Sequence, residues 1–336
     1  MKIAFFEASA SDQAYLRSLL AKEHDAVFCP DVLNDDNVSL AADAVVLSVF
    51  IYSKVNEGVA RQIPRLKCVA TRSTGFDHID LAFCESAGIA VQNVPRYGEN
   101  TVAEHTFSLI LALSRNSHKL YTRMMMASEE ISRTGLIGFD LNGKTLGVVG
   151  AGKIGLHVIR IAKGFGMNVI VYSRSKDDFL SDLLGFEYVE FDDLLAAADI
   201  ISLHVPLTEQ TRHLINKTNI EKIKPGAILI NTARGGVVCN EALAMALDRK
   251  ILAGAGLDAM ESEELVQEEI DPSSTERFSD LGAGLGLIYR DNVVFTPHIG
   301  YYSVEALQRI LDTTVANIHG FAVCKSPNPV ARQFSR

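Results

Sequence analysis

An arginine, a group of carboxylates and a histidine follow three apolar runs of the chain. Arg234, Asp258 and His298 stand at or just after the ends of the runs AILIN, AGAGLD and NVVFT. If these runs are parallel strands, their carboxyl ends meet at one edge of a sheet, where such sheets bind ligands. Each residue also has a structural interpretation, as a surface arginine, a solvated carboxylate or a turn residue after proline. Their shared position favours a functional site.

These residue types suit proton and hydride exchange on a small organic acid. Arginine binds a carboxylate through two parallel hydrogen bonds, and histidine titrates in the range needed to exchange a proton at a hydroxyl oxygen. A carboxylate beside the histidine raises its pKa and keeps the ring charged. Glu261, Glu263 and Glu264 all follow Asp258, and their order along the chain does not choose among them.

A glycine-rich turn indicates a dinucleotide cofactor. The segment Gly150–Gly155 has the GxGxxG pattern, follows an apolar run and opens a helical pattern. The first glycine allows a tight turn, the second lets the backbone approach a pyrophosphate, and the third lets the helix pack on the strand. A merely tight turn is the structural alternative, but the strands that follow favour a cofactor site.

The next candidate strand ends without the acidic residue that binds the ribose of NAD. Ser173 and Arg174 follow Tyr172, so the repulsion of a 2′-phosphate is removed and a guanidinium is added. Asp177 and Asp178 argue for NAD, and Arg174 has the alternative role of stacking on adenine. The predicted cofactor is therefore NADP or NAD, with an NADP-preferring or dual site favoured.

Short apolar runs that alternate with helical patterns predict an α/β protein with two doubly wound parallel-sheet domains. The middle of the chain has six candidate strands, at 146–150, 168–172, 199–203, 227–231, 253–258 and 292–296. Five more lie in the first hundred residues, in KIAFFEA, DAVFCP, DAVVLSV, LKCVATRS and IAVQNVP. The six-strand series matches a Rossmann-type sheet.

Two long helices are expected on either side of the middle segment. One covers 100–127, with Thr101 and Glu104 at capping-box spacing, and its apolar circumference predicts burial between domains or subunits. The other covers 303–323 and either completes the middle domain or returns to the first one. There is no low-complexity linker, so the crossings between domains are expected near residues 100 and 298.

The composition excludes several classes of protein. Of the 336 residues, 48% are apolar and 22% charged, and the net charge of −9 disfavours nucleic acid or an anionic membrane as partner. No apolar run approaches the roughly 20 residues of a membrane span, and the N-terminus lacks the pattern of a signal peptide. The five cysteines are scattered, which predicts reduced thiols, no metal site and a cytoplasmic location.

Seven ordered motifs carry a specific resemblance. The chain resembles the D-isomer-specific 2-hydroxyacid dehydrogenases over essentially its whole length. The motifs are TRSTGFDHID (71–80), NVPRYGENTVAEH (93–105), GKTLGVVGAGKIG (143–155), SLHVPLT (202–208), NTARGG (231–236), GLDAMESE (256–263) and TPHIG (296–300). One departure is the missing ribose carboxylate, which several NADP-using members also lack. Another is the segment 268–292, which has no assigned role.

The resemblance implies a role for each residue of the suspected site. Arg234 binds and polarises the substrate, and His298 is the acid/base. Glu263 is the partner of His298, because the family's glutamate lies five residues beyond the aspartate that corresponds to Asp258. Asp258 itself holds the nicotinamide carboxamide.

Substrate contacts are implied mainly in the first part of the chain. The backbone amides of Thr74 and Gly75 receive the substrate carboxylate. Tyr52, Tyr97 and Tyr302 resemble the aromatic surroundings of D-lactate dehydrogenases and would shield a small apolar side chain, with ordinary packing as the alternative.

The predicted cofactor contacts extend from the glycine loop to the loops after several other strands. His204 is interpreted as lining this pocket, with a buried structural histidine as the alternative, whereas His24, His118, His213 and His319 have no functional setting. The full set is Gly150, Gly152, Lys153, Ile154, Gly155, Ser173, Arg174, His204, Val205, Pro206, Thr211, Thr232, Ala233 and Asp258.

The resemblance also implies how the chain is divided. The substrate domain is flavodoxin-like and discontinuous, 1–100 plus 299–336, with the final helix packed on the first hundred residues. The Rossmann-type cofactor domain covers 101–298. Its first long helix resembles the family's dimer element, which implies a homodimer.

Together these features predict an NAD(P)-dependent D-2-hydroxyacid dehydrogenase, most like the D-lactate dehydrogenases, that reduces pyruvate or a similar 2-oxo acid. Two alternatives remain open. One is a glyoxylate/hydroxypyruvate reductase, which an NADP-leaning site also fits. The other is a nucleotide-sensing binding protein similar to corepressors on the same scaffold.

Overall fold

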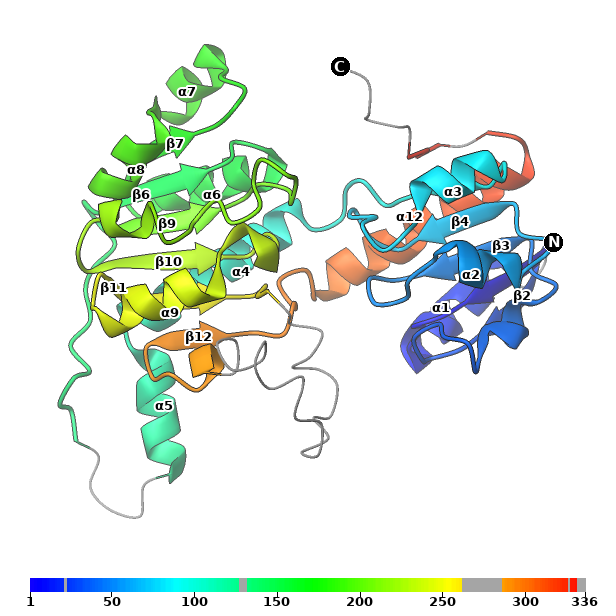
Figure 1. Ribbon diagram of the computed structural model, residues 1–336, viewed down its shortest axis with the longest axis horizontal. Coiled ribbons are helices and arrows are strands. Elements are labelled where there is room, and N and C mark those ends of the chain that lie inside the picture. The colour runs from blue at the N-terminus through cyan, green and yellow to red at the C-terminus, as the bar shows by residue number, and fades with distance from the viewer. Residues whose placement is uncertain (21–22, 127–131, 262–285, 326, 331–336) are drawn as a thin grey trace. The chain divides into compact units, whose positions relative to one another are not determined.

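A computed structural model describes residues 1–20, 23–126, 132–261, 286–325 and 327–330 of the chain. The chain forms two compact units: unit 1 contains Met1–Tyr97 and Ser303–Arg336, and unit 2 contains Gly98–Tyr302. Each unit is built on one parallel sheet (Figure 1). Hydrophobic clusters lie on both faces of each sheet.

Unit 1 has five parallel strands in the order β2-β1-β3-β4-β5, which is the order of flavodoxin-like sheets. Because both faces are covered, β3 and β4 are buried along their whole length and show no alternation of exposed residues. The strands are β1 Lys2–Phe5, β2 Asp25–Phe28, β3 Val46–Val49, β4 Cys68–Thr71 and β5 Ala90–Gln92. The helices are α1 Ala10–Leu20, α2 Glu57–Arg61, α3 Leu81–Ser86, α12 Val304–Ala322 and the 3-10 helix η1 Val38–Ala41.

Helix α12 belongs to unit 1 although it follows the last strand of unit 2. Its Leu311 and Ile318 join the hydrophobic cluster that contains Ile3, Phe5 and Leu16. Of the two alternatives that the sequence left open, the helix returns to the first hundred residues, as Figure 1 also shows.

Unit 2 has seven parallel strands in the order β12-β11-β10-β9-β6-β7-β8. Read from β8 to β11, this is the 3-2-1-4-5-6 order of Rossmann sheets, with β12 added at one edge. The predicted fold class is thereby confirmed. The strands are β6 Thr145–Val149, β7 Asn168–Tyr172, β8 Glu187–Tyr188, β9 Ile200–Leu203, β10 Ala227–Asn231, β11 Leu252–Leu257 and β12 Val293–Phe295.

Strand β8 was not predicted, because this edge strand has only two residues and no apolar run. The strand β9 is therefore the fourth of the sheet in chain order and lies beside β6. Helices cover both faces of the sheet. They are α4 Glu99–Ser114, α5 Ser117–Met126, α6 Lys153–Gly164, α7 Asp178–Leu184, α8 Phe191–Ala197, α9 Asn240–Asp248 and the 3-10 helices η2 Ile220–Lys222 and η3 Gly235–Val237.

The prediction of one continuous helix over 100–127 was wrong. The chain forms α4 and α5, which are separated at Asn116, a residue with φ of +50°. Asparagine tolerates this left-handed conformation better than most residues. The capping-box prediction was also wrong, since the N-cap is Gly98 and Thr101 lies inside the helix.

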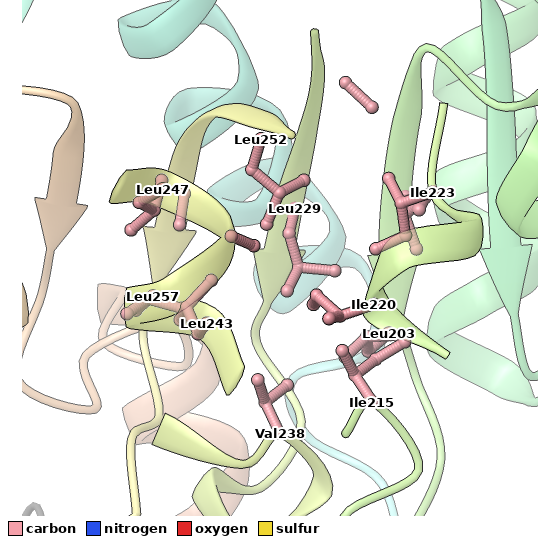
Figure 2. Packing of buried hydrophobic residues seen from close by; sticks show 14 of the residues in the cluster. Leu203, Ile215, Ile220, Ile223, Leu229, Val238, Leu243, Leu247, Leu252 and Leu257 are labelled. Atoms are coloured by element: carbon pink, nitrogen blue, oxygen red, sulfur yellow. The ribbon is translucent and has the colours of Figure 1, made fainter. Parts of the chain in front are cut away.

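The apolar face of α4 packs on the sheet of its own unit. In β11, a Cβ atom on Gly256 would lie 2.9 Å from Cβ of Leu109, and one on Gly254 would lie 3.1 Å from a methyl group of Leu113. The glycines of the run AGAGL thus allow a close approach of α4 to the strand that ends at Asp258. Figure 2 shows the core on the other face, where side chains of β9, β10 and β11 meet those of α9 and η2.

Candidate active site

The glycine loop between β6 and α6 has the geometry that a dinucleotide requires. Gly150 has φ of +101°, and a Cβ atom there would lie 2.6 Å from the carbonyl oxygen of His204. A Cβ atom on Gly155 would lie 2.1 Å from the carbonyl oxygen of Gly150, so only glycine fits. At Gly152 nothing lies within 4 Å of such an atom, which leaves the backbone open to a pyrophosphate.

The N-terminus of α6 is suited to bind that pyrophosphate. Gly152 is the N-cap and offers no side chain to the first amide groups of the helix, which begins at Lys153 and Ile154. Unsatisfied amides and the positive end of the helix dipole attract phosphate groups. The Lys153 ammonium lies 4.0 Å from the Glu99 carboxylate.

The loop after β7 exposes Arg174 beside a half-buried Ser173. Arg174 makes no hydrogen bond and no ion pair within the described part of the chain. Asp177, which argued for NAD, is the N-cap of α7 and accepts a hydrogen bond from the amide of Leu180 at 3.1 Å. The ammonium of Lys176 pairs with Glu190 at 3.3 Å.

His204 follows β9 and approaches the glycine loop through its backbone. Its Nε2 is 2.8 Å from Oγ of Ser202, and burial lowers the pKa of the ring to about 3, so the ring stays neutral. In the same loop the hydroxyl of Thr211 donates to the carbonyl of Pro206 at 2.5 Å and accepts from the amide of Thr208 at 2.8 Å. The Thr211 hydroxyl thus holds the shape of the loop that contains Val205.

Asn231, at the end of β10, organises the loop that carries Arg234. Its Nδ2 donates to the carbonyls of Arg234 at 3.0 Å and Ala259 at 3.1 Å, and its Oδ1 accepts from the amide of Ala233 at 3.1 Å. A Cβ atom on Gly235 would lie 2.2 Å from the Met260 backbone. The loops after β10 and β11 therefore lie against each other.

The arginine loop is also tied to α4. The hydroxyls of Thr232 and Thr106 are 3.0 Å apart. The Arg234 guanidinium donates to the carbonyl of Ala233 at 2.9 Å.

The carboxylate of Asp258 holds the loop that contains His298. Its Oδ1 accepts from the Thr296 hydroxyl at 2.6 Å and the Ile299 amide at 2.9 Å, and its Oδ2 accepts from the Gly300 amide at 2.8 Å. Burial by itself would raise the pKa of Asp258, but hydrogen bonds from His105 and Thr296 hold it below its ordinary value.

His298 itself has φ of +54°, which is unfavourable for a side chain with a Cβ atom. Its amide donates to the carbonyl of Asp258 at 3.0 Å and to that of Thr296 at 2.9 Å. These bonds and the amide hydrogen bonds of Ile299 and Gly300 to the Asp258 carboxylate fix the backbone of the loop. Residues in strained conformations of this kind cluster at active sites.

Glu263, the predicted partner of His298, lies outside the described residues, as does Glu264. Glu261 is described, and its carboxylate is 2.8 Å from Nε2 of His213 and 3.8 Å from the Arg212 guanidinium. His213 was predicted to have no functional setting, yet it pairs with one of the three candidate glutamates.

His105 on α4 is a site residue that the sequence analysis missed. Its Nε2 lies 3.2 Å from Oδ1 of Asp258 and 2.9 Å from the Thr296 hydroxyl. The histidine ends the motif NVPRYGENTVAEH, but nothing in its helical spacing distinguishes it from a packing residue. Asn231 was missed for a similar reason, since an asparagine after a strand is common in turns.

In unit 1, the loop after β4 presents two backbone amides. The amides of Thr74 and Gly75 donate to no acceptor within the described residues. The loop is held by its other groups, since the Thr74 hydroxyl donates to the carbonyl of Val94 at 2.8 Å and the Ser73 hydroxyl donates to that of Gly75 at 2.6 Å. Such a pair of amides suits a carboxylate.

The three tyrosines predicted to contact substrate have different settings. The amide of Tyr52 donates to the Glu7 carboxylate at 3.0 Å, and Glu7 also binds the amides of Phe50 and Ser53. The carbonyl of Tyr97 accepts from the Arg309 guanidinium at 2.7 Å. Tyr302 belongs to unit 2 and is 66% exposed.

A model of the NAD binding domain of D-isomer specific 2-hydroxyacid dehydrogenases matches residues 107–300. A 2-hydroxyacid dehydrogenase homolog of Haemophilus influenzae is 37% identical and covers 95% of this chain and 96% of its own. The chain belongs to this family. The resemblance predicted from the sequence is thus confirmed.

Two further relatives indicate the range of activities in this family. Glyoxylate reductase of Thermococcus litoralis is 37% identical over 85% of this chain and 82% of its own. The crystal structure of D-lactate dehydrogenase from Aquifex aeolicus complexed with NAD and lactic acid superposes with a TM-score of 0.86, at 36% identity and 98% of both chains. The protein is therefore an oxidoreductase of the 2-hydroxyacid dehydrogenase family with an NAD-binding domain. None of its described helices is long and apolar enough to span a membrane.

Proposed function

We propose that this enzyme reduces a small 2-oxo acid of the pyruvate type to the D-2-hydroxy acid, with His298 as the acid/base. The observation that carries the proposal is the strained backbone of His298, which the buried Asp258 carboxylate holds at the carboxyl edge of the sheet. The loop with Arg234 lies against the loop after β11 at this same edge. The glycine loop after β6 opens at the same edge as well.

Each group has a role in this proposal. The Arg234 guanidinium binds the substrate carboxylate and polarises the 2-oxo group, and the amides of Thr74 and Gly75 bind the same carboxylate. A bound nicotinamide supplies or accepts the hydride. His298 donates a proton to the carbonyl oxygen in reduction and removes it from the hydroxyl in oxidation. Glu263 stabilises the charged imidazole.

The residues present fit a nicotinamide dinucleotide, and we propose an NADP-preferring or dual site. The open backbone at Gly152 and the start of α6 receive the pyrophosphate. Arg174 is exposed and lacks a partner within the described residues, so it is available for a 2′-phosphate. Asp177 caps α7, so its carboxylate is already engaged in a hydrogen bond with the amide of Leu180.

The test is a steady-state assay of pyruvate, phenylpyruvate, glyoxylate and hydroxypyruvate with NADH and with NADPH. The proposal expects the highest kcat/KM with pyruvate or phenylpyruvate and a D-configured product. A second candidate, a glyoxylate/hydroxypyruvate reductase, is favoured by the similarity to the Thermococcus enzyme and expects the opposite ranking. Binding of either cofactor without turnover of any of the four acids would instead favour a nucleotide-sensing binding protein.

A further inference from the structure

Two histidines and a glutamate meet in unit 1. Glu23 and His24 lie between α1 and β2, and His319 lies near the C-terminal end of α12. One carboxylate oxygen and one nitrogen from each ring all lie within 4.8 Å of one another. The ring centroids of the two histidines are 5.3 Å apart, and the rings are nearly perpendicular.

Three of the four imidazole nitrogens of this cluster lack hydrogen-bond partners. Both ring nitrogens of His24 and Nε2 of His319 are shielded from solvent and unpartnered. They are three of the seven such side-chain atoms in the described part of the chain, so nearly half of the unpartnered buried polar atoms there lie at this cluster. Shielded polar atoms without a partner are uncommon in proteins and often indicate an ion or water site.

Positive charge lies close to the cluster, because the Met1 amino group is near His24. The nearby amino group would repel a cation, and the carboxylate of Glu23, 3.8 Å from Nδ1 of His319, offsets this charge.

We propose that Glu23, His24 and His319 form a binding site for zinc or a similar divalent transition metal. Two imidazoles and one carboxylate are a common zinc ligand set, which leaves a fourth position for water. Bonds of about 2.0–2.1 Å require ligand atoms roughly 3.4 Å apart, so the cluster must contract by about an ångström. The side chains of Glu23 and His319 are 66% and 39% exposed and are able to make this movement.

The metal would join the two separate segments of unit 1. His24 comes from the N-terminal segment and His319 from α12, which returns after the whole of unit 2. A ligand that binds only the folded state stabilises it by mass action. We therefore expect zinc to raise the unfolding temperature of the wild-type chain by a few degrees, and magnesium at the same concentration to have no such effect.

The test is a titration of the tag-free, full-length protein with ZnCl₂ in competition with a chromophoric chelator. The wild type should bind one more equivalent than His24→Gln or His319→Gln. His118→Gln is the matched control, because both ring nitrogens of His118 are already 2.9 and 3.0 Å from backbone carbonyl oxygens. Cysteines are the same in all these proteins, so zinc bound to thiols cancels in the comparison.

The variant Glu23→Gln should fold normally because the Glu23 side chain is exposed. Loss of this carboxylate should weaken zinc binding at least about tenfold. Equal stoichiometry and affinity in the wild type and in all three variants would overturn the proposal. None of the three residues belongs to the proposed catalytic machinery, so reduction of 2-oxo acids should remain unchanged in the variants.

Discussion

His298 has a strained backbone at the position where the proposed mechanism needs a proton donor. We expect His298→Ala to lower the rate of 2-oxo acid reduction by about 10²–10⁴-fold, the usual contribution of a positioned acid/base. The glycine loop and the start of α6 are untouched, so cofactor affinity should be nearly unchanged. Stopped-flow reduction rates and cofactor fluorescence titrations measure the two quantities. Near-normal turnover would show that another group transfers the proton.

His105 is expected to act on His298 through Asp258. His105→Gln removes a charge-assisted hydrogen bond to a buried carboxylate, so we expect kcat to fall about tenfold. The pKa of Asp258 is now held below its ordinary value; without His105 it rises. When the solution is acidified, the Asp258 carboxylate of the variant is then protonated at a higher pH than that of the wild type. The acid limb of the pH profile of kcat should therefore move to higher pH.

The matched control for this prediction is Ser114→Ala farther along α4, whose hydroxyl donates to the carbonyl of Leu111 at 3.4 Å. It should leave the acid limb in place. A His105→Gln enzyme with a lower rate but an unshifted pH profile would mean that His105 has only a packing role.

At the level of residues, the sequence predicted groups that carry their chemistry in their type and strand position. Arg234, Asp258 and His298 are in this class, and the structure places all three in loops after β10, β11 and β12. His105 and Asn231 act through hydrogen bonds to partners far away in the sequence, and such bonds cannot be predicted from one chain segment.

At the level of elements, the apolar runs predicted eleven strands, because parallel strands that are buried on both faces appear in a sequence as short continuous apolar runs. The errors came where local signals compete. The helix over 100–127 has one continuous apolar pattern, yet a left-handed Asn116 divides it. The capping-box spacing of Thr101 and Glu104 occurs inside α4, whose start is set at Gly98 instead.

The end of β7 is the element that should set cofactor preference. Ser173→Asp together with Arg174→Ala restores a carboxylate and removes the guanidinium available to a 2′-phosphate. We expect the ratio of kcat/KM for NADPH to that for NADH to fall at least about tenfold. Arg249→Ala, which removes an exposed arginine paired with Glu221, is the control and should leave the ratio unchanged. An unchanged ratio in the double variant would reject the proposed role of this loop.

At the level of the whole molecule, the return of α12 to unit 1 was not decided by its amphipathic pattern. An apolar stripe of this kind fits either sheet. The family resemblance implied the first hundred residues, and Leu311 and Ile318 do pack on the cluster around Phe5. The structure further shows that α4 covers the sheet of unit 2, so its apolar residues do not by themselves indicate a subunit interface.

The helix α5 is the better candidate for contact with a second copy. Tyr121, Met124 and Met125 are 66%, 56% and 70% exposed on this ten-residue helix. Large apolar side chains gathered on one element are typical of interfaces between subunits. We therefore expect the protein to be a dimer by light scattering and Tyr121→Asp with Met125→Lys to reduce its mass to that of one chain. Phe179→Asp, which changes a 73% exposed aromatic on α7, should leave the dimer intact. A wild-type protein that has the mass of one chain, or a dimer that survives the α5 substitutions, would exclude this interface.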